Sequence, residues 1–241
     1  MNFARLSPKI GIIALSAVGL TGCFDLTQKV AVRHDGSGTY AVEIAANGVV
    51  GEGLRQKDND DFDIGGDMHG TTHISRNGDV TTRSEEVAFK DISELKLDDE
   101  QLNLHVKGHG GDATELHFHR TFNVGSARHD RDDKDDEQMG REVLQSMFGG
   151  HTYTFVVWLP GHIERIAPVS ADGHLVVPTV WGDAAGHTII WKMQLTDMMM
   201  SDNLNFDVDF SAKGDFRDAQ SQPAPHHHHG GHHHDDDDDG D

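Results

Sequence analysis

The sequence predicts an α+β fold with roughly eight to ten antiparallel strands, one principal helix and a disordered tail. Three observations lead to this prediction. Apolar and polar residues alternate through much of the chain from residue 29 to 210, as they do in half-buried strands. Residues 137–148 repeat apolar side chains at the spacing of one helical face, and no strand–helix–strand crossover pattern occurs. The apolar pattern stops after Ala212.

Turn residues divide the first strands into hairpins. Asp35-Gly36-Ser37-Gly38 separates two alternating runs, and a second hairpin turns at Arg76-Asn77-Gly78-Asp79, because Asn-Gly favours a tight two-residue turn. Residues 47–70 are rich in glycine and aspartate, so we expect a long loop with a short helix near 50–56.

A third hairpin is predicted around the glycine-rich turn at 108–112. Setting His105 opposite His117 pairs the apolar residues of both strands with one another. The same register brings Lys107 opposite Glu115, a cation facing an anion. Every cross-strand pair is then favourable, which predicts this register.

Three histidines share one face of that hairpin. His105, His117 and His119 would lie roughly 5 to 7 Å apart, close enough for three imidazoles to ligate one metal ion. A solvated or helix-covered polar face explains the same pattern, because the chain has 19 histidines. The polar-face interpretation is the preferred one here.

The N-terminus has the pattern of a lipoprotein export signal. Arg5 and Lys9 precede an uncharged apolar run, Ile10 to Leu20, which is shorter than the roughly 20 residues that span a bilayer. The run ends in the lipobox Leu20-Thr21-Gly22-Cys23. We therefore expect cleavage before Cys23 once its thiol carries diacylglycerol. An ordinary signal peptide with a chance cysteine is the alternative.

The predicted organisation is a signal peptide at 1–22, a single domain at 23–211, and a linker with a His/Asp-rich tail at 212–241. Lipidation would attach the protein to a membrane of the cell envelope, outside the cytoplasm. Phe24 in place of aspartate after the lipidated residue favours the outer membrane if the organism is Gram-negative. A net charge of −21 argues against nucleic-acid partners, because phosphate backbones would be repelled.

The tail is rich in metal-binding side chains. Imidazoles are common ligands of divalent transition metals, so the tail is predicted to bind Ni²⁺, Cu²⁺ or Zn²⁺. Its histidines are His226, His227, His228, His229, His232, His233 and His234. An expression tag or low-complexity drift would give a similar composition.

Enzyme motifs are absent from the sequence. It contains no GxSxG elbow, HExxH helix, Walker A loop or GxGxxG after a strand, and its one cysteine is the predicted lipidation site. A single cysteine also excludes an intrachain disulfide framework. We expect a non-catalytic protein that requires no cofactor.

Several of these features together resemble the LppM-type bacterial lipoprotein domain. They are the lipobox at Cys23, the hairpin at Asp35-Gly36-Ser37-Gly38, the helix, Leu159-Pro160-Gly161 and a late strand with Trp191, within residues 24–210. The resemblance implies that the roughly eight to ten strands form a curved antiparallel β-sheet packed on the one principal helix, similar to START and Bet v 1 folds. The chain differs from the family in its acidic loop at 125–137, its tail and the lack of a C-terminal transmembrane helix.

The resemblance also implies an apolar cavity suited to lipids. The predicted function is thus a lipid-anchored envelope lipoprotein that binds an apolar or lipid-like ligand. The side chains expected to line its pocket are Val143, Leu144, Met147, Phe155, Val157, Trp191 and Phe206. The alternatives are binding or buffering of divalent metal by the tail, and a purely structural lipoprotein.

Overall fold

The computed structural model describes residues 24–56, 70–92, 95, 100–123, 134–183, 185–214 and 216. The strands are β1 (Phe24–Val32), β2 (Gly38–Asn47), β3 (Thr71–Asn77), β4 (Val80–Phe89), β5 (Glu100–Gly110), β6 (Ala113–Asn123), β7 (Thr152–Pro160), β8 (His162–Ile166), β9 (Val169–Ala171), β10 (His174–Val176), β11 (Thr179–Asp183), β12 (Gly186–Gln194) and β13 (Asn203–Ala212). The helices are α2 (Gly48–Gln56), α3 (Lys134–Phe148) and α4 (Leu195–Met200).

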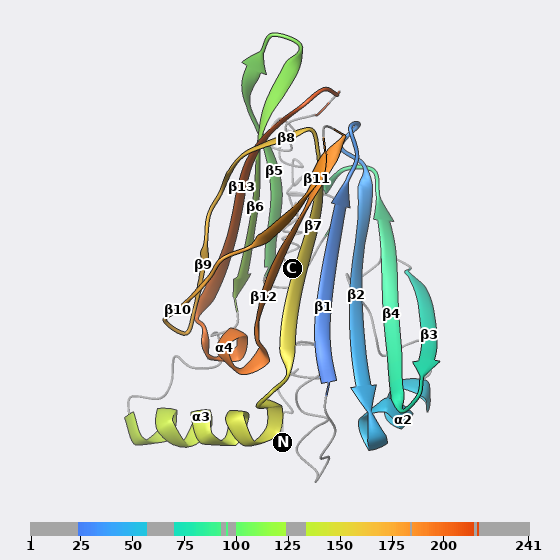
Figure 1. Ribbon diagram of the computed structural model, residues 1–241, viewed down its shortest axis with the longest axis vertical. Coiled ribbons are helices and arrows are strands. Elements are labelled where there is room, and N and C mark those ends of the chain that lie inside the picture. Colours follow the sequence, from blue (N-terminus) through green and yellow to red (C-terminus); the bar gives the residue numbers. More distant parts are fainter. Residues whose placement is uncertain are drawn as a thin grey trace, which may run out of the picture.

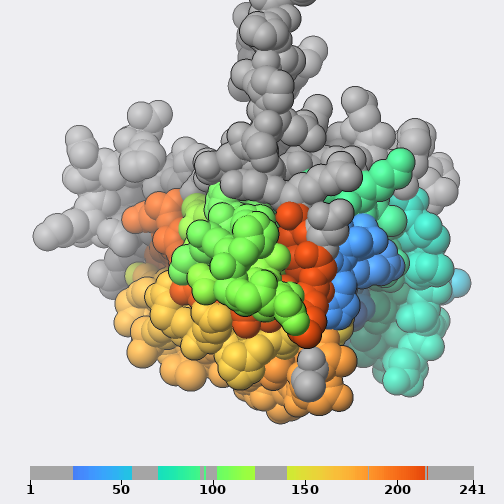
Figure 2. All heavy atoms as spheres, turned by 90° about the horizontal axis from the view of Figure 1, so that it is seen from above, coloured from blue at the N-terminus to red at the C-terminus, as the bar shows by residue number. Residues whose placement is uncertain are grey.

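Most strands belong to two sheets. Seven strands follow the order β11-β12-β7-β1-β2-β4-β3, four follow the order β5-β6-β13-β8, and β9 and β10 form a separate pair (Figure 1). The β5–β6 hairpin projects at the end opposite α3 (Figure 1). Figure 2 looks down on that end and shows the hairpin, in green, beside the red end of β13.

The three predicted hairpins are confirmed. β1 pairs with β2, β3 with β4, and β5 with β6, each antiparallel. In the first turn, the Asp35 carboxylate accepts hydrogen bonds from the backbone N–H and the hydroxyl of Ser37, at 3.1 and 2.6 Å. Gly78 of the second turn has a φ of 62°, a conformation that glycine adopts without steric cost. The short helix expected near 50–56 is present as α2.

Aromatic rings fill the core between the two large sheets. The Phe155 ring of β7 lies 5.8 Å from that of Trp191 in its own sheet, measured between centroids. From the facing sheet, Phe206 approaches Phe155 to 4.6 Å and Phe118 to 6.5 Å. All four side chains are fully buried. The space among them is therefore occupied by the rings themselves.

A buried arginine lies within this core. Arg120 occupies an inward position of β6, between Phe118 and Phe122, and is fully buried. Its Nη2 donates a hydrogen bond to Gln28 Oε1 at 2.6 Å, and its Cζ lies 4.4 Å from the Phe155 ring centroid. The sequence did not predict this position as part of the core, because its partner Gln28 and the Phe155 ring come from the other sheet.

The architecture differs from the expected one in strand number and in one pairing. The described chain has thirteen strands, because the segment after Pro160 forms several short strands that periodicity does not separate. β1 and β7 pair in parallel, with Leu26 opposite Tyr153, so the large sheet is mixed. Alternation shows which face of a strand is buried but does not identify its neighbour.

The principal helix does not cover a sheet face as expected. α3 lies across one end of the molecule, below the strands in Figure 1. Its last residue, Phe148, contacts Phe24 edge to face, with ring centroids 5.6 Å apart. Leu144 and Met147 are partly buried against the core, whereas Val143 is 50% exposed. Val143 is therefore half exposed and not enclosed in an apolar pocket as expected.

Candidate metal centre

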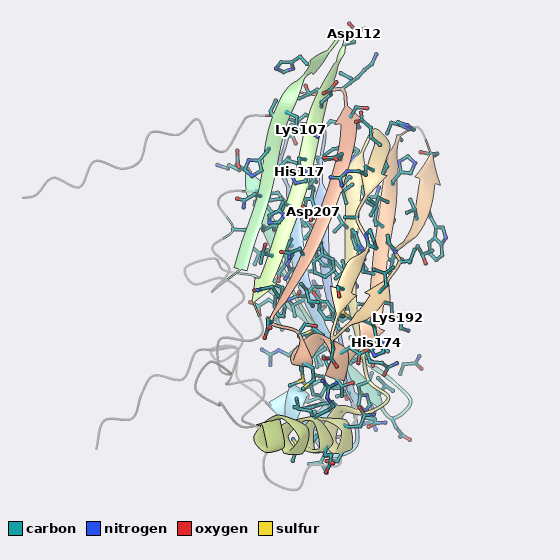
Figure 3. All side chains as sticks on the ribbon, turned by 90° about the vertical axis from the view of Figure 1, so that its left-hand side faces the viewer. Lys107, Asp112, His117, His174, Lys192 and Asp207 are labelled. Atoms are coloured by element: carbon teal, nitrogen blue, oxygen red, sulfur yellow. The ribbon has the colours of Figure 1, made fainter. Side chains whose placement is uncertain are left out.

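Two histidines and two aspartates meet on the outer face of the four-stranded sheet. Alternation in β6 buries Leu116 and Phe118 and leaves His117 and His119 on the opposite face. β13 runs antiparallel to β6, with Asp207 opposite His119 and Asp209 opposite His117. Figure 3 shows Lys107, His117 and Asp207 following one another along this sheet.

Three of these side chains direct ligand atoms toward one another. Oδ1 of Asp207 lies 2.7 Å from His119 Nδ1 and 3.2 Å from His117 Nε2. One ligand atom from each of the three residues lies within 4.8 Å of the others. Tetrahedral Zn²⁺, with bonds of about 2.0–2.1 Å, holds its ligand atoms about 3.3 Å apart. The cluster is therefore close to the dimensions of a metal site.

Hydrogen bonds around the cluster determine which imidazole nitrogens can bind metal. His117 Nδ1 lies 2.7 Å from Asp209 Oδ1, and a carboxylate only accepts, so this nitrogen carries a proton. Thr121 donates its hydroxyl proton to Asn205, at 3.0 Å, and so accepts from His119 Nε2, at 2.8 Å.

In the neutral imidazoles His117 Nε2 then carries a lone pair, and His119 Nδ1 carries one while its proton lies on Nε2; with a proton of its own, His119 Nδ1 donates to Asp207 instead. Both of these nitrogens face the Asp207 carboxylate. Three acceptors that face one another repel unless a cation lies among them. Either additional protons on the imidazoles or a metal ion can supply the positive charge.

Asp209 orients His117. Only 6% of Asp209 is exposed, and its other contacts are Arg165 Nε at 2.7 Å and Lys107 Nζ at 3.2 Å. Burial alone would raise the pKa of this carboxyl, but hydrogen bonds from Arg165, His117 and Lys107 lower it from 3.8 to about 2. A carboxylate behind a metal-binding imidazole fixes its tautomer and ring orientation.

The candidate site contains two of the three predicted histidines and an aspartate in place of the third. His105 does lie opposite His117, as the sequence predicted. The group that could hold a metal ion, however, consists of His117, His119 and Asp207. Asp207 and Asp209 alternate with Phe206 and Val208, which places them on an outer face, but only the pairing of β13 with β6 brings them to the histidines.

A β-bulge changes the expected partner of Lys107. The β5–β6 register shifts between Val106 and Gly108, so Glu115 lies opposite Gly108. The prediction that Lys107 faces Glu115 is therefore wrong. Lys107 instead reaches Asp209, two strands away. The bulge thereby adds a cation to the carboxylate that orients His117.

The other predicted site residues lie elsewhere. Cys23 and the tail histidines are outside the described residues. Of the predicted pocket, Phe155, Val157, Trp191 and Phe206 are fully buried in the core, and Phe155 contacts both Trp191 and Phe206. Ligand binding among them stays a prediction.

The lowered pKa of Asp209 predicts acid-sensitive stability. An aspartate in an unfolded chain titrates near 3.9, so the ionised carboxylate stabilises the fold above about pH 4. That contribution is lost as the pH falls toward 2. We expect Asp209→Asn to lower the free energy of unfolding by about 2 kcal/mol at pH 7 and to flatten its dependence between about pH 4 and 2.

Urea titrations at several pH values measure this effect. Asp112→Asn is the control, because Asp112 is 91% exposed at the tip of the β5–β6 hairpin (Figure 3). An Asp209→Asn profile that matches the parent protein would contradict the assigned role of Asp209.

Comparison with known proteins does not assign this chain to a family. No family model and no curated protein matches the sequence. Among solved structures, the chain is similar to the folded domain of LppM from Mycobacterium tuberculosis, determined by NMR, with a TM-score of 0.40 and 10% identity. The match covers 83% of this chain and 98% of that chain. No function is carried over from LppM at this level of similarity.

Within the described residues, no helix combines the length and apolar character needed to cross a membrane.

Proposed function

We propose that this chain is a lipid-anchored, non-catalytic protein of the bacterial cell envelope that binds a divalent metal ion through His117, His119 and Asp207. The lipobox at Cys23 supports the anchor. The metal function is supported above all by the two imidazole nitrogens that face one carboxylate oxygen, at 2.7 and 3.2 Å.

The donor set favours a borderline metal such as Zn²⁺. Imidazole nitrogens suit Zn²⁺, Cu²⁺ and Ni²⁺, whereas Ca²⁺ and Mg²⁺ prefer oxygen ligands throughout. Two histidines and one carboxylate leave a fourth tetrahedral position for water or an incoming ligand. A partly exposed site with an open position suits reversible loading better than permanent structural binding.

The tail is a second metal-binding candidate within the same function. Its seven histidines offer many donors, so several different sets of them can take the same ion. The sheet site has its imidazoles already held by Asp209 and Thr121. We therefore assign the more selective binding to the sheet and additional capacity to the tail.

An apolar ligand in the core receives less support. The predicted pocket residues of β7, β12 and β13 are fully buried, and their aromatic rings pack on one another.

Calorimetric titration with ZnCl₂ at neutral pH tests the metal function. Deleting residues 226–241 is expected to remove the tail sites and leave one equivalent of bound Zn²⁺. In that background His119→Ala should weaken binding by at least about 100-fold, since removal of even an outer partner of a metal ligand costs 10–100-fold. His105→Ala is the matched control, because it removes an imidazole from the adjacent strand of the same sheet.

Two results would contradict this assignment. Loss of all tight binding on deletion of the tail would place the function in the tail histidines. Binding that survives His119→Ala but is lost in His105→Ala would require a different ligand set.

A further inference from the structure

The outer face of part of the seven-stranded sheet is apolar. Strand register places Trp158 of β7, Thr188 of β12 and Trp181 of β11 in one row. In the next row, Val156 lies opposite Ile190. The alternate residues of β7 and β12 are buried in the core, so this set points away from it. We call these five residues the β7–β12–β11 face.

This face is open to solvent in the described part of the chain. Trp181 is 64% exposed on an edge strand, and Trp158, Val156 and Ile190 are partly exposed. The outward positions of a solvated antiparallel sheet are ordinarily polar. Contiguous exposed apolar patches mark interaction surfaces, and tryptophan is enriched where proteins meet the membrane interface.

The apolar area continues toward α4. Leu175 and Val177 are strongly exposed and line a groove together with Lys192. Lys192 belongs to the same outward series of β12 as Ile190.

Cations border the β7–β12–β11 face on two sides. Lys192 lies at one side, and Lys29 of β1 lies opposite Val156 in the parallel pair at the other. Lys29 also forms an ion pair with Glu43 at 2.7 Å, on the side away from β7. Asp183, two residues beyond Trp181 in β11, and Asp197, which lines the groove with Lys192, offset these cations. The apolar area, rather than charge, therefore favours contact with a bilayer.

In the sequence, the predicted anchor directly precedes a strand of the same sheet. Cys23 directly precedes Phe24, the first residue of β1, and β1 pairs with β7. Ala31, which lies opposite Trp158, is seven residues beyond Phe24, or about 23 Å along an extended strand. A bilayer that holds the acyl chains is therefore within reach of both tryptophans.

We propose that the β7–β12–β11 face rests on the lipid bilayer that carries the anchor, with Trp158 and Trp181 in the interfacial layer. This contact depends on the lipid-anchor part of the proposed function and not on metal binding. It would orient the metal centre, which lies on the other large sheet, away from the membrane surface.

Quenching by brominated lipid tests this contact. The lipidated full-length protein is reconstituted in phosphatidylcholine vesicles with or without bromine on the acyl chains. Bromine is expected to reduce tryptophan emission in the parent protein. The loss should be smaller in Trp181→Phe and absent in the Trp158→Phe/Trp181→Phe double variant, whose remaining tryptophan, Trp191, is fully buried.

Vesicle flotation measures the anchor separately. Protein that floats but emits equally in both kinds of vesicle overturns the bilayer contact while leaving the anchor intact. Failure to float overturns both. Trp181 shielded from acrylamide in detergent micelles, together with dimers in sedimentation, would show that a second copy covers this face, and that result also overturns the proposal.

Discussion

Replacing Phe155 with alanine is expected to lower the free energy of unfolding by about 3 to 5 kcal/mol. The Phe155 ring is fully buried and contacts Phe118, Trp191 and Phe206, so its removal leaves a cavity between the two sheets. It also removes the ring beneath the Arg120 guanidinium. Urea denaturation followed by far-UV circular dichroism measures the change.

The matched control is Val143→Ala on the exposed side of α3, where we expect a change within about 0.5 kcal/mol. The comparison also distinguishes a packed core from a ligand pocket. If Phe155→Ala costs less than about 1 kcal/mol, the ring faces open space, and the apolar-ligand hypothesis regains support.

Cys23→Ser is expected to abolish membrane attachment. The lipoprotein signal peptidase acts only after the thiol carries diacylglycerol, so the serine variant should remain an uncleaved or soluble precursor. Detergent phase partitioning and the mass of the intact protein measure the effect. Thr21→Ser is the control, because it keeps both the thiol and a small residue in the lipobox. A Cys23→Ser protein with a processed mass in the detergent phase would refute the lipobox interpretation.

The candidate metal centre was half predictable from local sequence. His105 and His117 face each other across a hairpin whose strands are joined by a short turn, so the alternation of apolar residues was sufficient to predict that they are opposite each other. Asp207 is 88 residues from His119, and nothing in its own strand indicates which strand it pairs with. Only the tertiary structure therefore shows that the third residue of the candidate site is Asp207 and not His105.

The core shows the same division. Alternation correctly predicted that Phe155, Trp191 and Phe206 are buried, because the face of a strand follows from its two-residue period. The position of α3 at one end of the molecule was not predictable. An amphipathic pattern shows that one side of a helix is buried, but not against which part of the fold.

The sequence by itself determined the three N-terminal hairpins and the inward faces of the main strands, and it alone carries the predictions made at Cys23 and in the tail. These depend on turn residues, period-two alternation and short motifs, all of which act over a few residues. Only the tertiary structure decided the parallel pairing of β1 with β7, the burial of Arg120 and the meeting of Asp207 and Asp209 with His117 and His119. Each of these joins segments far apart in the chain, and strands with the same alternation are locally interchangeable until the packing of the whole fold selects their neighbours.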